Sequence, residues 1–247
     1  MDRDGRGGYV GWSRRLAQCI ANAQGGLLYA NLGVRGLTTR EIRERQLAPA
    51  LAMRPDLASV FSGTNDVLRF QFDAGVFAAD VRALQRELRE SGATVITFTL
   101  PDLSPLLPWA RPLASRILVM NDIVRAACAE TGARLVDFAA YPVSTDPRLW
   151  DPDRIHANPA GHARIADALA HALGLLDAGD AWKAPLSALP RESAVRSVAR
   201  ELGWAGRYLV PWAVAQMLPT RPSLHDASTR ELRPLTPRLS PVTSAEA

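Results

Sequence analysis

The sequence predicts a three-layer α/β fold, in which a parallel β-sheet is covered by helices on both faces. Short apolar runs alternate with longer segments whose apolar residues recur at helical spacing. This alternation is typical of parallel βαβ units. Glycines follow several of the helical segments, and polar residues collect where apolar runs end, as expected at the ends of helices and strands.

Each predicted helix is supported by apolar residues that would line one face. In the first helix, Trp12, Leu16 and Ile20 form this face, and Gly25-Gly26 ends the helix. In the third helix, the inward residues include Phe77 and Leu84. In chain order, helices are expected at 9–23, about 39–51, 73–91, 113–131 and about 160–173.

The predicted strands are short apolar runs between these helices. The run at 57–61, for example, stops at the polar sequence Ser62-Gly63-Thr64-Asn65-Asp66. The carboxyl ends of parallel strands lie at one edge of a sheet, and loops from distant segments converge there. In chain order, strands are expected at 27–32, 57–61, 94–100 and 134–138.

Composition narrows the class of protein. The formal net charge is only +4, and the basic residues are almost all arginine, Lys183 being the single lysine. No basic run interleaved with aromatic residues indicates a nucleic-acid partner. Cys19 and Cys128 are far apart and lie in predicted helices, so we expect reduced, buried thiols rather than a disulfide framework or a cysteine metal site.

The sequence MDRDGRGGYVGW at the start has no apolar segment typical of a signal peptide, and 18 uncharged apolar residues never occur in succession. On the condition that Met1 is the true start, we expect a soluble, cytoplasmic protein.

The stretch from Asp151 to His162, DPDRIHANPAGH, is the strongest candidate for a site. Asp153 precedes His156 by three residues, and an Asn-Pro-x-Gly turn and a new helix follow. A carboxylate bonded to one ring nitrogen fixes the histidine tautomer and leaves the other nitrogen to transfer a proton. The alternative is a helix start with incidental polar residues. Asp151 competes with Asp153 for the role of orienting acid.

Three loops together resemble the SGNH hydrolase family, also called GDSL-type esterases and lipases. The matching motifs are NLGVRG, SGTND and DPDRIHANPAGH, and the resemblance covers roughly residues 9–173. It implies a flavodoxin-like αβα sandwich that hydrolyses carboxylic esters through a serine and an acyl-enzyme, without a metal or other cofactor. It also implies the site residues: Gly36 and Asn65 as oxyanion-hole donors, Asp153 as the acid and His156 as the base.

Elementary chemistry is consistent with these roles. Acyl transfer places negative charge on the carbonyl oxygen, and rigid N–H donors aimed at that oxygen contribute roughly 3 to 4 kcal/mol each. Taken alone, Gly36 fits an ordinary turn, and Asn65 fits a local turn or a helix cap. His162 is expected in the first helical turn after the loop. His171 and His225 have no partner pattern, so a zinc site is disfavoured.

The family's Gly-Asp-Ser motif, which carries the nucleophilic serine on the first strand, does not occur in this sequence. Ser13 lies within a predicted helix and is a poor substitute. Without the central first strand, two strands would lose a shared neighbour, which dimerisation or a changed strand order could offset. We expect a start assigned some residues too late. The alternative is a non-catalytic binding protein, since loss of the nucleophile costs about a millionfold in turnover.

The chain changes character after the hydrolase-like domain, expected at 1–178. An amphipathic helical extension is expected at 179–218, with Val195, Val198, Leu202 and Leu209 on its apolar side. This side, together with Trp204, Trp212 and Met217, is expected to pack on the hydrolase, and a weak contact with a membrane surface is the alternative. Residues 219–247 are rich in proline, serine and threonine and are expected to be disordered. The expected partner is a small-molecule ester, and the loop at 101–112 is expected to influence which ester.

Overall fold

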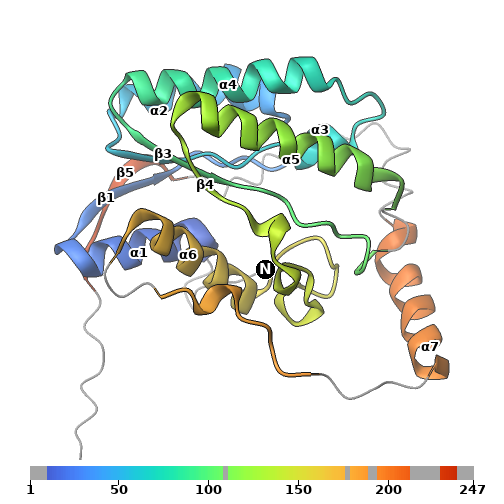
Figure 1. Ribbon diagram of the computed structural model, residues 1–247. Helices are drawn as coiled ribbons and strands as arrows, with labels where there is room; N and C mark the ends of the chain where they lie inside the picture. Colours follow the sequence, from blue (N-terminus) through green and yellow to red (C-terminus); the bar gives the residue numbers. More distant parts are fainter. Residues whose placement is uncertain (1–9, 108–110, 176–178, 189–193, 212–228, 238–247) are drawn as a thin grey trace, which may run out of the picture.

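A three-stranded parallel sheet lies at the centre of the molecule (Figure 1). The computed structural model describes residues 10–107, 111–175, 179–188, 194–211 and 229–237. The strands are β2 (Leu57–Ser59), β3 (Thr94–Phe98) and β4 (Arg134–Val136), in the order β2-β3-β4. Leu57 is in register with Thr94, and Ile96 with Arg134. All three strands fall within the predicted apolar runs.

Helices cover both faces of this sheet (Figure 1). On one face lie α2 (Thr39–Ala52), α4 (Ala74–Glu90) and α5 (Arg111–Thr131), and on the other lie α1 (Trp12–Gln24) and α6 (Pro159–Leu173).

Neighbouring residues of β3 show the layering directly. Val95 packs with the cluster formed by α2, α4 and α5, and Ile96 packs with the cluster formed by α1 and α6. Both side chains are fully buried. Successive side chains of a strand point to opposite faces, so each face of β3 is covered by one of the helical layers. The predicted three-layer αβα sandwich is therefore confirmed.

The strand predicted at 27–32 forms β1 (Leu27–Asn31), but it does not join the parallel sheet. It pairs antiparallel with β5 (Thr229–Leu235) in a separate two-stranded sheet, with Leu27 opposite Leu235. Within the described ranges, no strand pairs with both β1 and β2, so the two sheets are not joined by hydrogen bonds.

The prediction of disorder for 219–247 is thus wrong for β5. This segment, TRELRPL, has no apolar run that would reveal a strand. It becomes a strand because β1 offers an open edge of backbone N–H and C=O groups. Apart from Thr236 and Pro237, the remaining residues of the predicted tail lie outside the described part of the chain.

Short helical turns complete the described chain. They are α3 (Thr64–Leu68), the 3-10 turns η2 (Phe138–Ala140), η3 (Pro142–Thr145), η4 (Pro147–Leu149) and η5 (Ala181–Lys183), and, after α7 (Ala194–Trp204), the π-helical turn η6 (Ala205–Leu209).

The predicted C-terminal helix forms as α7, but its apolar side is not inward as expected. Val198 is 59% exposed and Leu202 is 69% exposed. The helix meets the body through Trp204, as expected, and through Glu201, because these side chains find polar partners on a loop of the body. In the regions that the structure describes, no helix has the length and apolar character to cross a bilayer.

Candidate active site

Asp153 and His156 form a directly bonded pair. The His156 ring donates from Nδ1 to Asp153 Oδ2 at 2.7 Å, since an ionised carboxylate can only accept. The other oxygen, Asp153 Oδ1, accepts from the backbone N–H groups of Ile155 at 2.9 Å and His156 at 3.0 Å. The His156 side chain is 48% exposed. This geometry leaves Nε2 as the nitrogen that can exchange a proton with a substrate or nucleophile.

The environment of Asp153 keeps it ionised. Burial by itself would raise the pKa of Asp153. The hydrogen bonds from the His156 ring and from the backbone N–H groups of His156 and Ile155 outweigh burial and lower the pKa from 3.8 to about 2. A carboxylate charged at neutral pH stabilises an imidazolium that forms beside it.

A compact turn holds this pair. The backbone N–H of Asp151 donates to His156 O at 2.8 Å, and the N–H of Arg154 donates to Asp151 O at 2.8 Å. Arg154 adopts a left-handed conformation with φ of 60°, which costs roughly 1 to 2 kcal/mol for a residue with a side chain. Of the two acids considered for the orienting role, Asp153 is the one whose carboxylate bonds the His156 ring.

The Asn-Pro-x-Gly sequence then starts α6. Asn158 caps the helix by accepting from Gly161 N at 3.0 Å, and its Nδ2 donates to Arg148 O at 2.8 Å. Pro159 occupies the first turn, where no N–H is needed. A Cβ at Gly161 would collide with Leu149 O, so this position requires glycine. The motif therefore fixes where the turn meets the helix.

Gly36 and Asn65 come together from distant parts of the sequence. Gly36 has φ of 82°, a left-handed conformation that favours glycine. Asn65 Nδ2 donates to Leu37 O at 3.0 Å, so the asparagine lies against the loop that contains Gly36. An amide nitrogen has two N–H groups, and the second can donate to another oxygen.

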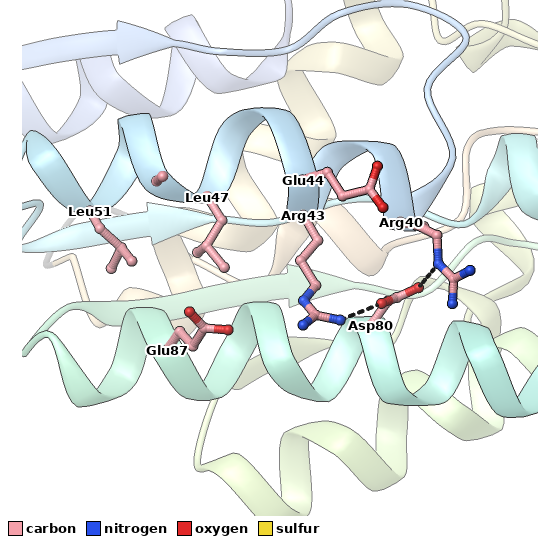
Figure 2. A pocket seen from close by; sticks show the side chains of 8 residues that line it. Arg40, Arg43, Glu44, Leu47, Leu51, Asp80 and Glu87 are labelled. Atoms are coloured by element: carbon pink, nitrogen blue, oxygen red, sulfur yellow. Dashed lines mark hydrogen bonds and ion pairs between the residues drawn. The ribbon is translucent and has the colours of Figure 1, made fainter.

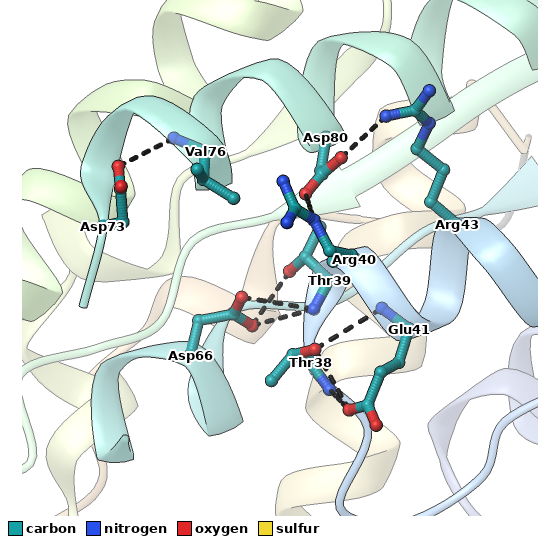
Figure 3. A network of polar contacts seen from close by, with 9 residues as sticks. All are labelled: Thr38, Thr39, Arg40, Glu41, Arg43, Asp66, Asp73, Val76 and Asp80. Carbon is teal, nitrogen blue, oxygen red and sulfur yellow. Dashed lines mark hydrogen bonds and ion pairs between the residues drawn. The ribbon is translucent and has the colours of Figure 1, made fainter. Parts of the chain in front are cut away.

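Asp66 joins the same two loops (Figure 3). Its carboxylate accepts from Thr39 N at 3.0 Å and from Thr39 Oγ1 at 3.0 Å. Burial raises the pKa of Asp66, although the Thr39 hydrogen bonds act in the opposite direction. The next residue back, Thr38, forms a capping box with Glu41 at the start of α2. Asp66 and Thr38 thus fix the loop that presents Gly36.

Both halves of the predicted site lie at the carboxyl edge of the parallel sheet. Asn65 lies in α3, which follows β2, and the 151–158 turn follows β4 through η2, η3 and η4. The segment after β3 lies beside this turn, because Arg154 Nη1 donates to Leu106 O at 3.0 Å. Loops at this edge are the usual location of sites in such sheets.

The other residues considered from the sequence lie elsewhere or have structural roles. Ser13 is in α1, with its Oγ 2.9 Å from the Tyr29 hydroxyl. His162 lies in the first turn of α6 as expected, and His171 lies in its last turn. His225 lies outside the described residues.

The two cysteines differ from each other. Cys128 is buried as predicted, and burial raises the pKa of its thiol to about 11, whereas Cys19 is only partly buried. In the described part of the chain, no group of three His, Cys, Asp or Glu residues is arranged to hold a metal ion.

A groove of about 340 Å³ lies between α2 and α4 (Figure 2), and none of the four predicted site residues lines it. Asp80, which is 2% exposed, accepts there from Arg43 Nη1 at 2.8 Å and from Arg40 Nε at 3.4 Å. The two guanidinium groups neutralise the buried carboxylate. The groove therefore contains a structural ion pair between two helices.

Sequence reasoning missed Arg154 and Glu201 beside the Asp153–His156 turn, and it expected Trp204 to pack on the hydrolase without identifying its partner. Arg154 forms a bidentate pair with Glu201, and Trp204 Nε1 donates to Pro152 O at 2.8 Å. Glu201 and Trp204 are 47 and 52 residues away from their partners, so no local pattern signals these contacts.

Known proteins resemble this chain in sequence and in fold. An acetylxylan esterase of Geobacillus stearothermophilus is 25% identical over 185 residues, which is 68% of this chain and 81% of that protein. Two solved structures share the fold. An α/β hydrolase from the metagenome of Lake Arreo, Spain, has a TM-score of 0.57 at 24% identity, covering 71% of this chain and 90% of its own. An acetylxylan esterase from Geobacillus stearothermophilus has a TM-score of 0.56 at 21% identity, covering 73% and 85%.

The sequence profile of the GDSL-like lipase/acylhydrolase family matches residues 2–164, about two thirds of the chain. This range includes the three motifs NLGVRG, SGTND and DPDRIHANPAGH. It ends within α6, before the C-terminal segment that contains α7 and β5. The chain belongs to the GDSL-like lipase/acylhydrolase family.

Proposed function

We propose that this protein hydrolyses carboxylic esters by acyl transfer, with His156 as the base and Asp153 as the acid that orients it. The observation that carries the proposal is the 2.7 Å hydrogen bond between Asp153 Oδ2 and His156 Nδ1, in a member of an ester hydrolase family. A carboxylate on Nδ1 sets the tautomer in which Nε2 is unprotonated and can accept a proton.

In this proposal, His156 Nε2 takes the proton of a serine hydroxyl as the oxygen attacks the ester carbonyl. The carbonyl oxygen becomes an oxyanion, which the backbone N–H of Gly36 and the side-chain amide of Asn65 stabilise. The protonated His156 then gives its proton to the departing alcohol, and an acyl-enzyme remains. A water molecule, deprotonated by the same nitrogen, releases the acid and restores the serine.

The mechanism needs a nucleophilic serine, and no serine of this sequence is assigned to that role. The Gly-Asp-Ser triplet that carries the family's serine does not occur in the sequence. A second candidate function is a non-catalytic protein that binds an ester with the same loops. The two candidates differ in one property, which is the presence of a reactive serine that His156 can deprotonate.

As substrate we propose a short acyl ester, in the first place an acetyl group on a carbohydrate. The support for this class is the curated relative, an acetylxylan esterase. The loop after β3 is the part of this chain that we expect to select the acyl group, since it lies against the 151–158 turn through the Arg154 to Leu106 hydrogen bond.

Hydrolysis of acetyl, butyryl and long-chain esters by the protein, purified from the cells that make it, tests the proposal. The acetyl ester should be cleaved fastest, and the His156→Ala variant should lose activity by orders of magnitude. A fluorophosphonate probe should label one serine, which peptide mass spectrometry identifies. Activity that survives in His156→Ala contradicts the mechanism. Binding of acetylated xylo-oligosaccharide without hydrolysis or labelling supports the binding protein.

A further inference from the structure

Helix α7, at the right of Figure 1, contacts the turn that carries Asp153 and His156. Arg154 Nη1 and Nη2 donate to the two carboxylate oxygens of Glu201 at 2.6 and 2.9 Å. Trp204 Nε1 donates to the backbone oxygen of Pro152 at 2.8 Å. Two residues of one helix, three positions apart and so on one face, therefore bind the residues on either side of Asp153.

Arg154 is the centre of this contact. Its guanidinium lies 4.7 Å from the centroid of the Trp204 ring, a cation–π distance, while Nη1 also donates to Leu106 O at 3.0 Å. The Arg154 side chain is only 16% exposed, so the ion pair with Glu201 is shielded from solvent on the arginine side. A bidentate guanidinium–carboxylate pair fixes direction as well as distance.

Ile155, the residue after Arg154, is held by apolar contacts. Ile155 and Trp204 pack against a buried cluster formed by Leu103, Leu106 and Leu107. This cluster lies in the segment that follows β3. Trp204 of α7 and Ile155 of the turn thus pack against the same buried cluster.

These contacts reach Asp153 through the backbone. The Ile155 and His156 N–H groups that donate to Asp153 Oδ1 belong to the peptide units next to Arg154 and Ile155. Arg154 itself is in a left-handed conformation, with φ of 60°, which a free turn would tend to leave. A restraint on Arg154 and Ile155 therefore also restrains the carboxylate that bonds the His156 ring.

We propose that α7 is a positioning element of the active site, and that Glu201 and Trp204 hold the Asp153–His156 pair in its bonded geometry. The proposal rests on the proposed role of this pair in proton transfer. The family profile matches residues 2–164, and α7 lies beyond them. The contact between α7 and the Asp153–His156 turn therefore comes from a segment outside the part that the profile matches.

The test measures the geometry of the pair in the full chain and needs no catalytic activity. The pKa of the Asp153 carboxyl group is followed by NMR, with Asp153→Asn to assign its signal, in the unchanged protein and in Glu201→Gln and Trp204→Phe. In both variants the turn should loosen, the hydrogen bonds to Asp153 should weaken, and the pKa should rise from about 2 toward 3.8. The Ile155 and His156 amides should also exchange faster with solvent.

The sign of the change separates positioning from simple electrostatics. Removing the negative charge of Glu201, and freeing Arg154, would by charge alone lower the pKa of Asp153, which is opposite to the expected rise. Trp204→Phe changes no charge and keeps an aromatic ring, so it isolates the hydrogen bond to Pro152. Glu130→Gln is the matched control, because Glu130 forms a bidentate pair of similar geometry with Arg82, at 2.6 and 3.1 Å, between α4 and α5.

A pKa of Asp153 that stays at about 2 in both variants, or that falls in Glu201→Gln, overturns the proposal. A rise of the same size in Glu130→Gln overturns it as well, because the effect would then be general destabilisation. These outcomes are independent of ester hydrolysis. If the proposed function is wrong, His156→Ala will still hydrolyse esters. The Asp153 pKa measured in Glu201→Gln and Trp204→Phe tests the role of α7 separately from that result.

Discussion

Asp153 is the residue on which the geometry of the candidate site depends most. It accepts three hydrogen bonds within four residues of chain, from the Ile155 and His156 backbone and from the His156 ring. The same contacts therefore shape the turn and orient the histidine. Stability and the proposed chemistry are linked at this residue.

This linkage predicts a pH dependence of stability. The pKa of Asp153 is about 2 in the folded protein and 3.8 as its ordinary value, so the ionised form is favoured by folding. Its contribution should be fully present above about pH 5 and lost as the pH falls through 3.8 toward 2. Urea unfolding at several pH values should show Asp153→Asn less stable than the unchanged protein at pH 6, with the difference shrinking below pH 4. A difference that is constant with pH would contradict this assignment.

Asn65 gives a second prediction for a single residue. If its amide stabilises the oxyanion, Asn65→Ala should lower kcat by about 100-fold to 1000-fold with a smaller change in KM. Kinetics with an acetyl ester and a catalytically active preparation check this. Asn65 also bonds Leu37 O, so unfolding of the variant must be measured in parallel. A loss of stability with unchanged kcat would assign Asn65 to structure alone.

Among the elements, β3 determines where the two helical layers sit. It is the central strand of the parallel sheet, and its successive residues Val95 and Ile96 pack on opposite layers. Its carboxyl end leads to the buried cluster at Leu103, Leu106 and Leu107, beside the 151–158 turn. Packing of this strand therefore influences both the core and the support of the site.

We expect Ile96→Ala to lower the free energy of unfolding by about 2 to 5 kcal/mol, because Ile96 is fully buried and the cavity cannot be filled. Denaturant unfolding followed by circular dichroism measures this. Leu118→Ala on α5 is the matched control, since Leu118 is 59% exposed, and it should change stability by less than about 0.5 kcal/mol. Equal losses in the two variants would show that β3 is not the centre of the core.

At the scale of the whole molecule, α7 and β5 from the C-terminal part of the chain pack against earlier segments. β5 pairs with β1, and α7 binds the 151–158 turn, so two segments beyond the family match contact opposite ends of the fold. In Figure 1 these contacts lie at the two sides of the sheet. Helix α7 and strand β5 are therefore part of the folded unit.

A chain ending at residue 228 should be less stable and more prone to aggregation than the full chain, because the edge of β1 loses its partner strand. A chain ending at 237 keeps β5 and should behave like the full chain. Light scattering and urea unfolding distinguish the two. If both truncated chains match the full chain, the β1–β5 pairing contributes nothing to stability.

Local patterns in the sequence determined most of the layers. The helices and the parallel strands were predictable because their apolar residues recur within one element, and each strand of the parallel sheet lies inside a predicted run. The proximity of Asp153 to His156 was also predictable, since three residues of chain cannot separate them far. The roles of these residues in catalysis remain predictions.

Contacts between distant segments were decided only by the tertiary structure. The pairing of β5 with β1, the exposed apolar side of α7 and the Arg154–Glu201 ion pair have no sequence signal. The physical reason is that such contacts depend on which edges and faces remain open after the layers have packed. The sequence by itself specified the Asp153–His156 turn and the layers around it, whereas the fold alone decided that α7 would contact that turn.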